Sequence, residues 1–137
     1  MPAAVDEKSM VPTVLVGIGG TGAEVLSRVR RLVEESYGSL ENFPIVSFLT
    51  VDTDKDYKVS NPEAAGSPFK DNEKFWARVS GKQVQEIINN LENYPWINSW
   101  FPSELAKNIS GLEAGAGQIR ACGRFAFFCN YYDIQQK

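Results

Sequence analysis

The feature that most constrains the fold is the stretch VPTVLVGIGGTGAEVLSRVRRL, residues 11–32, in which glycines separate two well-patterned segments. Residues 11–18 are almost continuously apolar and β-branched, which is typical of a strand buried on both faces of a parallel sheet. From Ala23 to about Tyr37 the apolar period becomes that of a helix, and Gly38 provides a stop. The predicted buried stripe of this helix consists of Val25, Val29, Leu32 and Val33.

The opposite face of the same predicted helix carries charges of opposite sign at i,i+4 spacing. The pairs are Glu24 with Arg28, Arg30 with Glu34, and Arg31 with Glu35. Such pairs face one another on a helix, and on a solvated surface each contributes only about 0.3–0.5 kcal/mol. We therefore interpret this face as solvent-exposed.

A second apolar run, IVSFLTV at residues 45–51, follows Pro44 and predicts another strand. Residues 11–51 then read as strand, glycine loop, helix and strand, a βαβ unit with parallel strands and a right-handed crossover. This predicts an α/β, Rossmann-like fold, in which a parallel sheet lies between flanking helices in three layers. The 137 residues suffice for one domain, and we interpret residues 1–10 as a mobile tail and residues 11–137 as part of that domain.

The rest of the chain predicts a loop, a short strand and two more helices. Residues 55–73 are polar and rich in Pro, Gly and Ser, as expected of a loop, and residues 74–79 alternate like a third strand. Ser80 and Gln83 have capping-box spacing at the start of a helix that Pro95 ends. The side chains predicted to point inward are Phe75, Ala77 and Val79 in the strand and Val84, Ile87, Ile88 and Leu91 in the helix.

The last predicted helix follows a second glycine turn, GAGQ, and contains both cysteines. Its apolar side consists of Ile119, Cys122, Phe125, Ala126 and Cys129. Seven residues of helix separate the thiols by about 10 Å, too far for a disulfide, so we interpret both as core residues. Trp96 and Trp100, in the irregular aromatic segment 94–102, either fill the core beneath a loop or stack at an interface, and the core is favoured.

The glycine loop GIGGTG matches G-x-G-x-x-G, between a predicted strand and a predicted helix. The first glycine, Gly17, permits a tight turn, Gly19 lets backbone approach a phosphate, and Gly22 lets the helix pack on the strand. The helix N-terminus adds free N–H groups and a partial positive charge. Phosphate binding is favoured over a bare βα turn, while the Thr21 hydroxyl either contacts phosphate or helps to cap the helix.

Two further motifs bear on which ligand such a loop would hold. Asp52 ends the second predicted strand within VDTD, and Asp52 and Asp54 are candidates for contacts with ribose, base or hydrated magnesium, or are simply two loop acids. As for metal ligation, the interpretation of Asp52 and Asp54 as two loop acids that bind no metal ion is favoured. The turn GAGQ, residues 115–118, leads into a helix and is a second candidate phosphate site. Two such turns suit a di- or triphosphate better than a dinucleotide.

Composition excludes several classes of function. The net charge of -3 provides no basic field for nucleic acid, so we expect no nucleic-acid partner. No apolar run reaches the roughly 18 residues of a membrane span, and no signal-peptide pattern opens the chain. With reduced thiols, this predicts a cytoplasmic protein. The absence of histidine excludes Ser-His and Cys-His catalysis.

The order of GIGGTG, VDTD and GAGQ resembles the tubulin/FtsZ superfamily, and more narrowly the bacterial tubulin-like proteins. The resemblance implies a GTP/GDP site, with Mg²⁺ as a further option, and self-association into a homo-oligomer or filament. The implied contacts are Gly17, Gly19, Gly20, Thr21 and Gly22 at the phosphates, Asp52 and Asp54 in the second loop, and Ala116, Gly117 and Gln118 at the terminal phosphate.

Asp52 stands where the family has asparagine, and two larger departures qualify that resemblance. The segment between the second and third loops is long and contains tryptophan, and the family's Gly-Gly-Gly-Thr-Gly-Thr/Ser-Gly loop and its hydrolytic acidic loop are absent. With so few predicted strands, we expect the N-terminal part of a longer GTPase domain that does not hydrolyse GTP alone. Arg120 and Arg124 either reach phosphate or a neighbouring subunit, or belong to a solvated face.

Two alternative functions remain open at this point. One is a Rossmann domain of an oxidoreductase that binds NAD(P) or FAD, with Asp52 on the ribose. The other is a non-catalytic scaffold whose aromatic segment 94–102 binds a partner.

Overall fold

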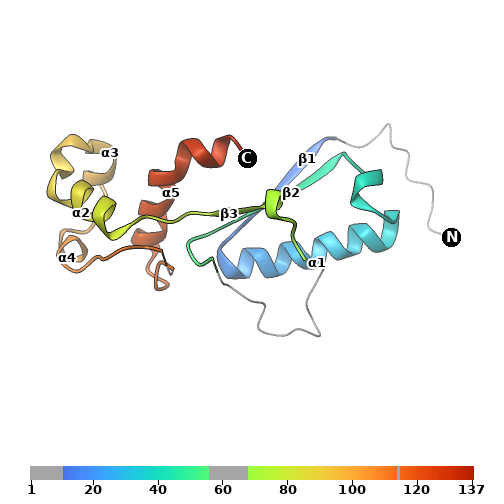
Figure 1. The fold of residues 1–137 in the computed structure, drawn as a ribbon, viewed down its shortest axis with the longest axis horizontal. Coiled ribbons are helices and arrows are strands. Elements are labelled where there is room, and N and C mark those ends of the chain that lie inside the picture. Colours follow the sequence, from blue (N-terminus) through green and yellow to red (C-terminus); the bar gives the residue numbers. More distant parts are fainter. Residues whose placement is uncertain (1–10, 56–67, 114) are drawn as a thin grey trace. The chain divides into compact units, whose positions relative to one another are not determined.

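The computed structural model describes residues 11–55, 68–113 and 115–137, and within it the chain forms two compact units (Figure 1). Unit 1 comprises residues 1–51 and 58–75, and unit 2 comprises residues 52–57 and 76–137. The predicted tail, residues 1–10, and most of the predicted loop 55–73 lie outside the described residues.

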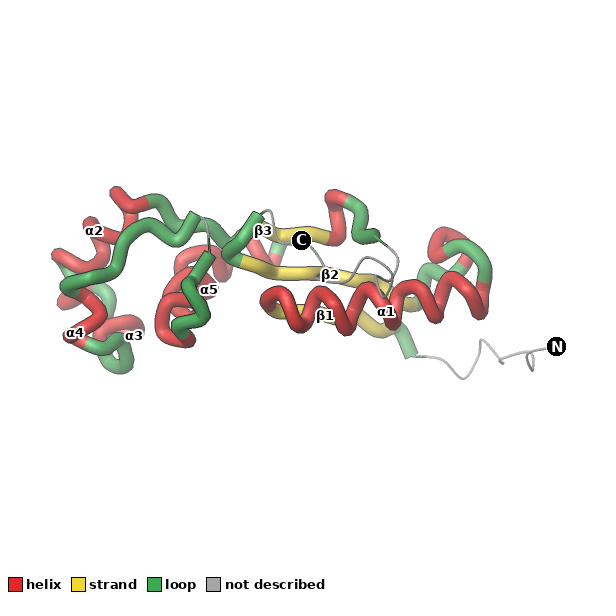
Figure 2. Tube along the Cα trace, turned by 90° about the horizontal axis from the view of Figure 1, so that it is seen from below, coloured by secondary structure: helices red, strands yellow, loops and turns green. Residues whose placement is uncertain are grey.

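Unit 1 contains the predicted βαβ arrangement. Strand β1 (Thr13–Ile18) leads into helix α1 (Gly19–Tyr37), which is followed by the 3₁₀ turn η2 (Leu40–Asn42) and strand β2 (Val46–Asp52). The two strands pair in parallel, from Thr13 opposite Val46 to Ile18 opposite Val51, and α1 runs back alongside them (Figure 2). A second 3₁₀ turn, η4 (Asp71–Glu73), precedes β3 (Lys74–Trp76), and the sheet order is β1-β2-β3. The predicted α/β class with a parallel sheet is confirmed.

Helix α1 begins at Gly19, four residues before the predicted start at Ala23. The apolar period of the sequence marks the helix only from Ala23 onward. Glycine keeps its backbone N–H and can form the first turn of a helix, at a cost in backbone entropy and not in hydrogen bonds. The helix stops as predicted at Gly38, which has φ 84° and donates its N–H to the Glu34 carbonyl at 2.8 Å.

The predicted apolar stripe of α1 is wrong at Val25 and Leu32, whereas Val29 and Val33 are half-buried. Val25 and Leu32 are 56% and 61% exposed, whereas the buried residues of the helix are Leu26, Ser27 and Arg30. Contact of the helix start with β1 turns a neighbouring face inward. On β1, Val14, Val16 and Ile18 are at least half exposed, so within the described residues this strand is not buried on both faces; the predicted double burial is also wrong.

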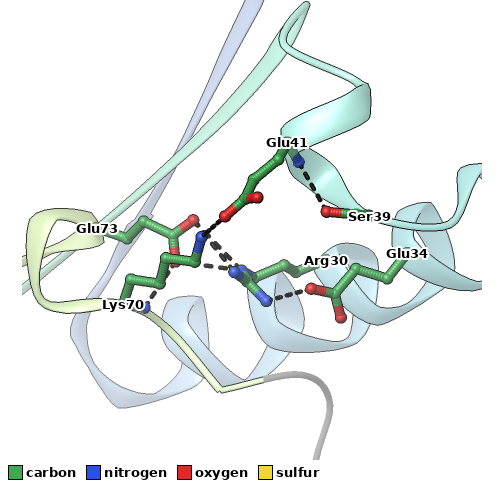
Figure 3. A network of polar contacts seen from close by, with 6 residues as sticks. All are labelled: Arg30, Glu34, Ser39, Glu41, Lys70 and Glu73. Carbon is green, nitrogen blue, oxygen red and sulfur yellow. Dashed lines mark hydrogen bonds and ion pairs between the residues drawn. The ribbon is translucent and has the colours of Figure 1, made fainter.

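The charged face of α1 is likewise not uniformly solvated (Figure 3). Arg31 and Glu35 pair at 2.7 Å with both side chains 55% exposed, as predicted. Arg30, only 3% exposed, donates to Glu34 at 2.7 Å and to Glu73 at 3.1 Å. Because Glu73 also accepts the backbone N–H of Lys70 at 2.8 Å, this buried ion pair fastens α1 to the segment that leads into β3.

Unit 2 is mainly helical and contains an apolar cluster. Its elements are α2 (Gly81–Asn89), the 3₁₀ turn η5 (Leu91–Asn93), α3 (Pro95–Asn98), α4 (Ser103–Ala106) and α5 (Arg120–Gln135). The side chains of Val79, Val84 and Phe125 are fully buried in the cluster. Ser80 caps α2 as predicted, by accepting the Gln83 N–H at 3.2 Å.

Several boundaries and burials in unit 2 differ from prediction. Helix α2 ends at Asn89, and Pro95 opens α3 instead of ending a helix, because proline needs no N–H at a first helical position. Trp100 packs against the apolar cluster as expected, whereas Trp96 is 54% exposed. Ile119 is 45% exposed because it lies one residue before α5, outside its apolar side.

Both cysteines behave as core thiols. Cys122 is buried and Cys129 packs against the same apolar cluster, and neither forms a disulfide. Burial raises the pKa of both thiols, that of Cys129 to about 11. At neutral pH they remain protonated and therefore poor nucleophiles.

Candidate functional site

The glycine loop joins β1 to α1 by a close backbone approach. A Cβ built on Gly17 would lie 2.7 Å from the Gly22 carbonyl oxygen, and one on Gly22 would lie 3.0 Å from the Gly17 carbonyl carbon. Real Cβ atoms do not tolerate the shorter contact, so these two glycines allow the strand end and the helix start to touch. The packing role predicted for Gly22 is confirmed, and Gly17, predicted to permit a tight turn, lies on the other side of the same close approach.

Gly19, the middle glycine of the motif, differs from its neighbours. It has φ 71°, and a Cβ built on it would meet nothing within 4 Å. Position 19 therefore requires glycine because of its left-handed backbone, and the space beside the residue is open. The open space lies at the first residue of α1, where N–H groups point out of the helix.

The N-terminus of α1 has no side-chain cap among the described residues, and its first turn contains no acidic residue. Thr21 is the third residue of the helix and is exposed, so the interpretation of Thr21 as a cap is wrong. Helix α2, by contrast, is capped by Ser80. The first turn of α1 thus retains its N–H groups and the partial positive charge of a helix start, the arrangement that attracts an anion.

The second loop begins where β2 ends, at Asp52. The preceding residue, Val51, pairs with Ile18, the last residue before α1, so the first and second loops follow adjacent ends of parallel strands. The turn is closed by an Asp54 N–H donated to Asp52 Oδ1 at 3.0 Å. Its backbone is also held by the Ala77 N–H, which donates to the Asp52 carbonyl at 2.7 Å.

The third loop, GAGQ, has a backbone that glycine favours. Gly115, Gly117 and Gln118 have φ of 111°, 58° and 60°, and Gln118 is the one non-glycine residue with positive φ in the described part of the chain. Helix α5 starts at Arg120, again without a side-chain cap. A left-handed glutamine carries strain, and strained backbone concentrates at functional sites.

Unit 2 brings the second and third loops together. A Cβ built on Gly115 would lie 3.8 Å from Cβ of Asp54, an ordinary van der Waals contact. A side chain at position 115 would therefore pack against the acidic turn. The glycine loop belongs to unit 1.

The structure also places the two arginines that the sequence singled out in the last helix. Arg124 stacks on aromatic rings, with Cζ 4.2 Å from the centroid of Trp100 and 5.7 Å from that of Phe128. Arg120 is exposed at the start of α5. In the part of the chain that the structure describes, no group of three or more His, Cys, Asp or Glu side chains is placed to hold a metal ion.

Sequence reasoning missed Trp76. Its indole Nε1–H donates to the Thr53 carbonyl, between the two acids of the second loop, at 3.0 Å. No local pattern links residues 23 positions apart, so only a three-dimensional structure reveals this contact.

The geometry defines a class of protein: an α/β chain in which two glycine turns each open a helix without a side-chain cap, one of them beside an acidic turn. A family model described as tubulin-like matches residues 14–137, and the chain therefore belongs to the tubulin-like family. Neither a curated protein nor a solved structure matches it. None of the described helices combines the length and the apolar character that a membrane span requires.

Proposed function

We propose that the chain is the guanine-nucleotide-binding, N-terminal portion of a bacterial tubulin-like protein that self-assembles. The observation that carries the proposal is the open, uncapped start of α1 at Gly19, which combines free N–H groups with a backbone bare of side chains. Membership of the tubulin-like family supports the choice of a guanine nucleotide.

Each loop has a proposed role. The N–H groups of Gly19, Gly20, Thr21 and Gly22 bind the inner phosphates, and Ala116, Gly117 and Gln118, before the uncapped start of α5, bind the terminal phosphate. Asp52 and Asp54 contact the ribose, the base or a hydrated ion. Their carboxylate oxygens fit Mg²⁺, which is commonly held by one or two carboxylates together with phosphates and water.

The chain's own residues support binding more than hydrolysis. It has no histidine to act as a general base, and it lacks the Gly-Gly-Gly-Thr-Gly-Thr/Ser-Gly loop. We propose that GTP turnover requires groups from elsewhere in the assembled protein. The chain contributes phosphate binding and the acidic turn.

Calorimetric titration of the full-length protein with GTP, ATP, NAD and FAD tests the ligand. We expect GTP to bind most tightly, whereas preference for NAD or FAD would support a dinucleotide domain, and silence of all four would support a scaffold. Light scattering with and without GTP tests self-assembly, for which a nucleotide-dependent rise is expected. A flat trace counts against the filament proposal.

A matched pair of variants tests the glycine loop. Gly19 and Gly38 both have positive φ, both have open space around a built Cβ, and they flank α1 at opposite ends. Gly19→Asp adds a carboxylate where the phosphates are proposed, so GTP affinity should fall at least 100-fold. Gly38→Asp carries the same change away from the loop and should bind normally. Equal affinities in the two variants would refute the phosphate-loop assignment.

A further inference from the structure

Trp76 contacts the acidic turn through its indole nitrogen. Nε1–H donates to the Thr53 carbonyl at 3.0 Å, and Thr53 separates Asp52 from Asp54. The bond therefore acts on the peptide unit that joins Thr53 to Asp54. Because an indole N–H is a donor only, the contact has one possible direction.

The same turn has two other fixed points. Asp54 N–H donates to Asp52 Oδ1 at 3.0 Å, and Ala77 N–H donates to the Asp52 carbonyl at 2.7 Å. Consecutive residues of the chain, Trp76 and Ala77, thus hold two consecutive carbonyls of the turn. The peptide planes of the turn cannot reorient through φ and ψ without breaking one of these contacts.

Trp76 also contacts the turn through its ring. Lys55, the residue after Asp54, places Nζ 5.3 Å from the ring centroid, and Arg78 places Cζ 5.1 Å from it. Both distances are within the range of cation–π attraction. The indole thus joins β3 to both the middle and the end of the acidic turn.

We propose that Trp76 is a positioning residue for the second nucleotide loop, and this inference rests on the proposed function. By holding the Thr53 carbonyl and the Lys55 side chain, Trp76 fixes the direction of the Asp52 and Asp54 carboxylates. These face the nucleoside or a hydrated ion, whereas the glycine loops bind the phosphates. Loss of the indole N–H should therefore weaken recognition of the nucleoside and spare that of a bare polyphosphate.

The first test uses ligand-free protein and is independent of nucleotide. Trp76→Phe keeps an aromatic ring and removes the donor, and Trp96→Phe is the control, because Trp96 is 54% exposed on α3. Amide hydrogen exchange at Asp54 should accelerate about five- to tenfold in Trp76→Phe, the equivalent of one lost hydrogen bond, and remain unchanged in Trp96→Phe. Equal exchange in both variants overturns the positioning role.

The second test compares GTP with inorganic tripolyphosphate by calorimetry. We expect Trp76→Phe to weaken GTP binding about five- to tenfold and to leave tripolyphosphate binding unchanged. Equal weakening of both ligands would show a merely structural role, and unchanged binding of both would show no role; either result overturns the proposal. Failure of the wild-type protein to bind GTP overturns the proposed function instead, and the exchange result identifies which of the two has failed.

A third measurement applies if Trp76→Phe does not fold. In wild-type protein, the Nε1–H resonance of Trp76 should shift when GTP is added and stay in place when tripolyphosphate is added. A resonance that ignores GTP, in protein that binds it, overturns the proposal.

Discussion

Two helices of this chain start after glycine turns, and they are held in place by different means. At α1 the glycines allow a close backbone approach, and the buried face of the helix carries Arg30 in an ion pair. At α5 the turn has positive φ at three residues, and the buried face is apolar, with Phe125 and Ala126 fully buried. Glycine thus serves two physical purposes in one molecule: to remove a side chain that would clash, and to permit a left-handed backbone.

The strongest test of this comparison removes the anchor of α5. Phe125→Ala deletes a ring that is 0% exposed, and the cavity should lower the free energy of unfolding of unit 2 by about 4 kcal/mol. Phe127→Ala, on the same helix but 37% exposed, should cost less than about 1 kcal/mol. Urea unfolding followed by near-UV circular dichroism measures both. Similar losses would show that α5 is not anchored by its buried face.

The corresponding test for α1 removes the partner of its buried arginine. Glu73→Ala removes the ion pair that Glu73 makes with the buried Arg30 at 3.1 Å, and should lower the free energy of unfolding by about 3 kcal/mol. Glu35→Ala breaks the exposed pair that Glu35 makes with Arg31 at 2.7 Å, and should cost less than about 0.5 kcal/mol. Thermal unfolding of the two variants measures both losses of stability. If Glu73→Ala melts like wild type, the ion pair does not anchor α1.

Substitutions within the first turn separate the two uses of glycine. Gly17→Ala forces a methyl group to within 2.7 Å of the Gly22 carbonyl oxygen, and should cost about 2 kcal/mol through overpacking. Gly19→Ala meets no atom within 4 Å and should cost only the left-handed backbone penalty, about 1 kcal/mol. Urea titration ranks the pair. The reverse order would contradict the assignment of roles.

In the GAGQ turn before α5, we expect glycine to be required only because it permits a left-handed backbone. A Cβ at Gly117 meets nothing within 4 Å, but its φ is 58°, so Gly117→Ala should cost about 1 kcal/mol. Gly117→Asn should cost less, because asparagine tolerates this conformation better than alanine. A smaller loss for alanine than for asparagine, in the same urea titration, would show that backbone handedness does not explain this glycine.

The smallest effect is expected at a glycine that serves neither purpose. Gly123 lies inside α5, it is not among the positive-φ residues, and a Cβ there meets nothing within 4 Å. Gly123→Ala should therefore raise the free energy of unfolding by about 0.8 kcal/mol through helix propensity. A loss of stability in thermal unfolding would reveal a packing role at this position.

Sequence patterns predicted where the helices and strands lie in the chain better than they predicted which face of each element is buried. The two strands, the stop at Gly38, the Ser80 cap and the glycine turn before α5 depend on contacts between near neighbours in the chain, and all are confirmed. The exposed Val25 and the buried Arg30 were predicted the wrong way round. The periodicity of apolar residues predicts the buried face of a helix only approximately. Contacts with the rest of the fold decide which of two neighbouring faces is buried.

The sequence by itself determined the strand–glycine–helix–strand order, the resemblance that the family match confirms, and the identity of the three candidate loops. Only the tertiary structure decided that Gly19 stands apart from Gly17 and Gly22, that Asp54 lies against Gly115, and that Trp76 holds the acidic turn. The physical reason is the separation in sequence between the residues that interact. Propensity, capping and glycine chemistry act between residues close in sequence, whereas a site is assembled by contacts that the chain makes only once it is folded.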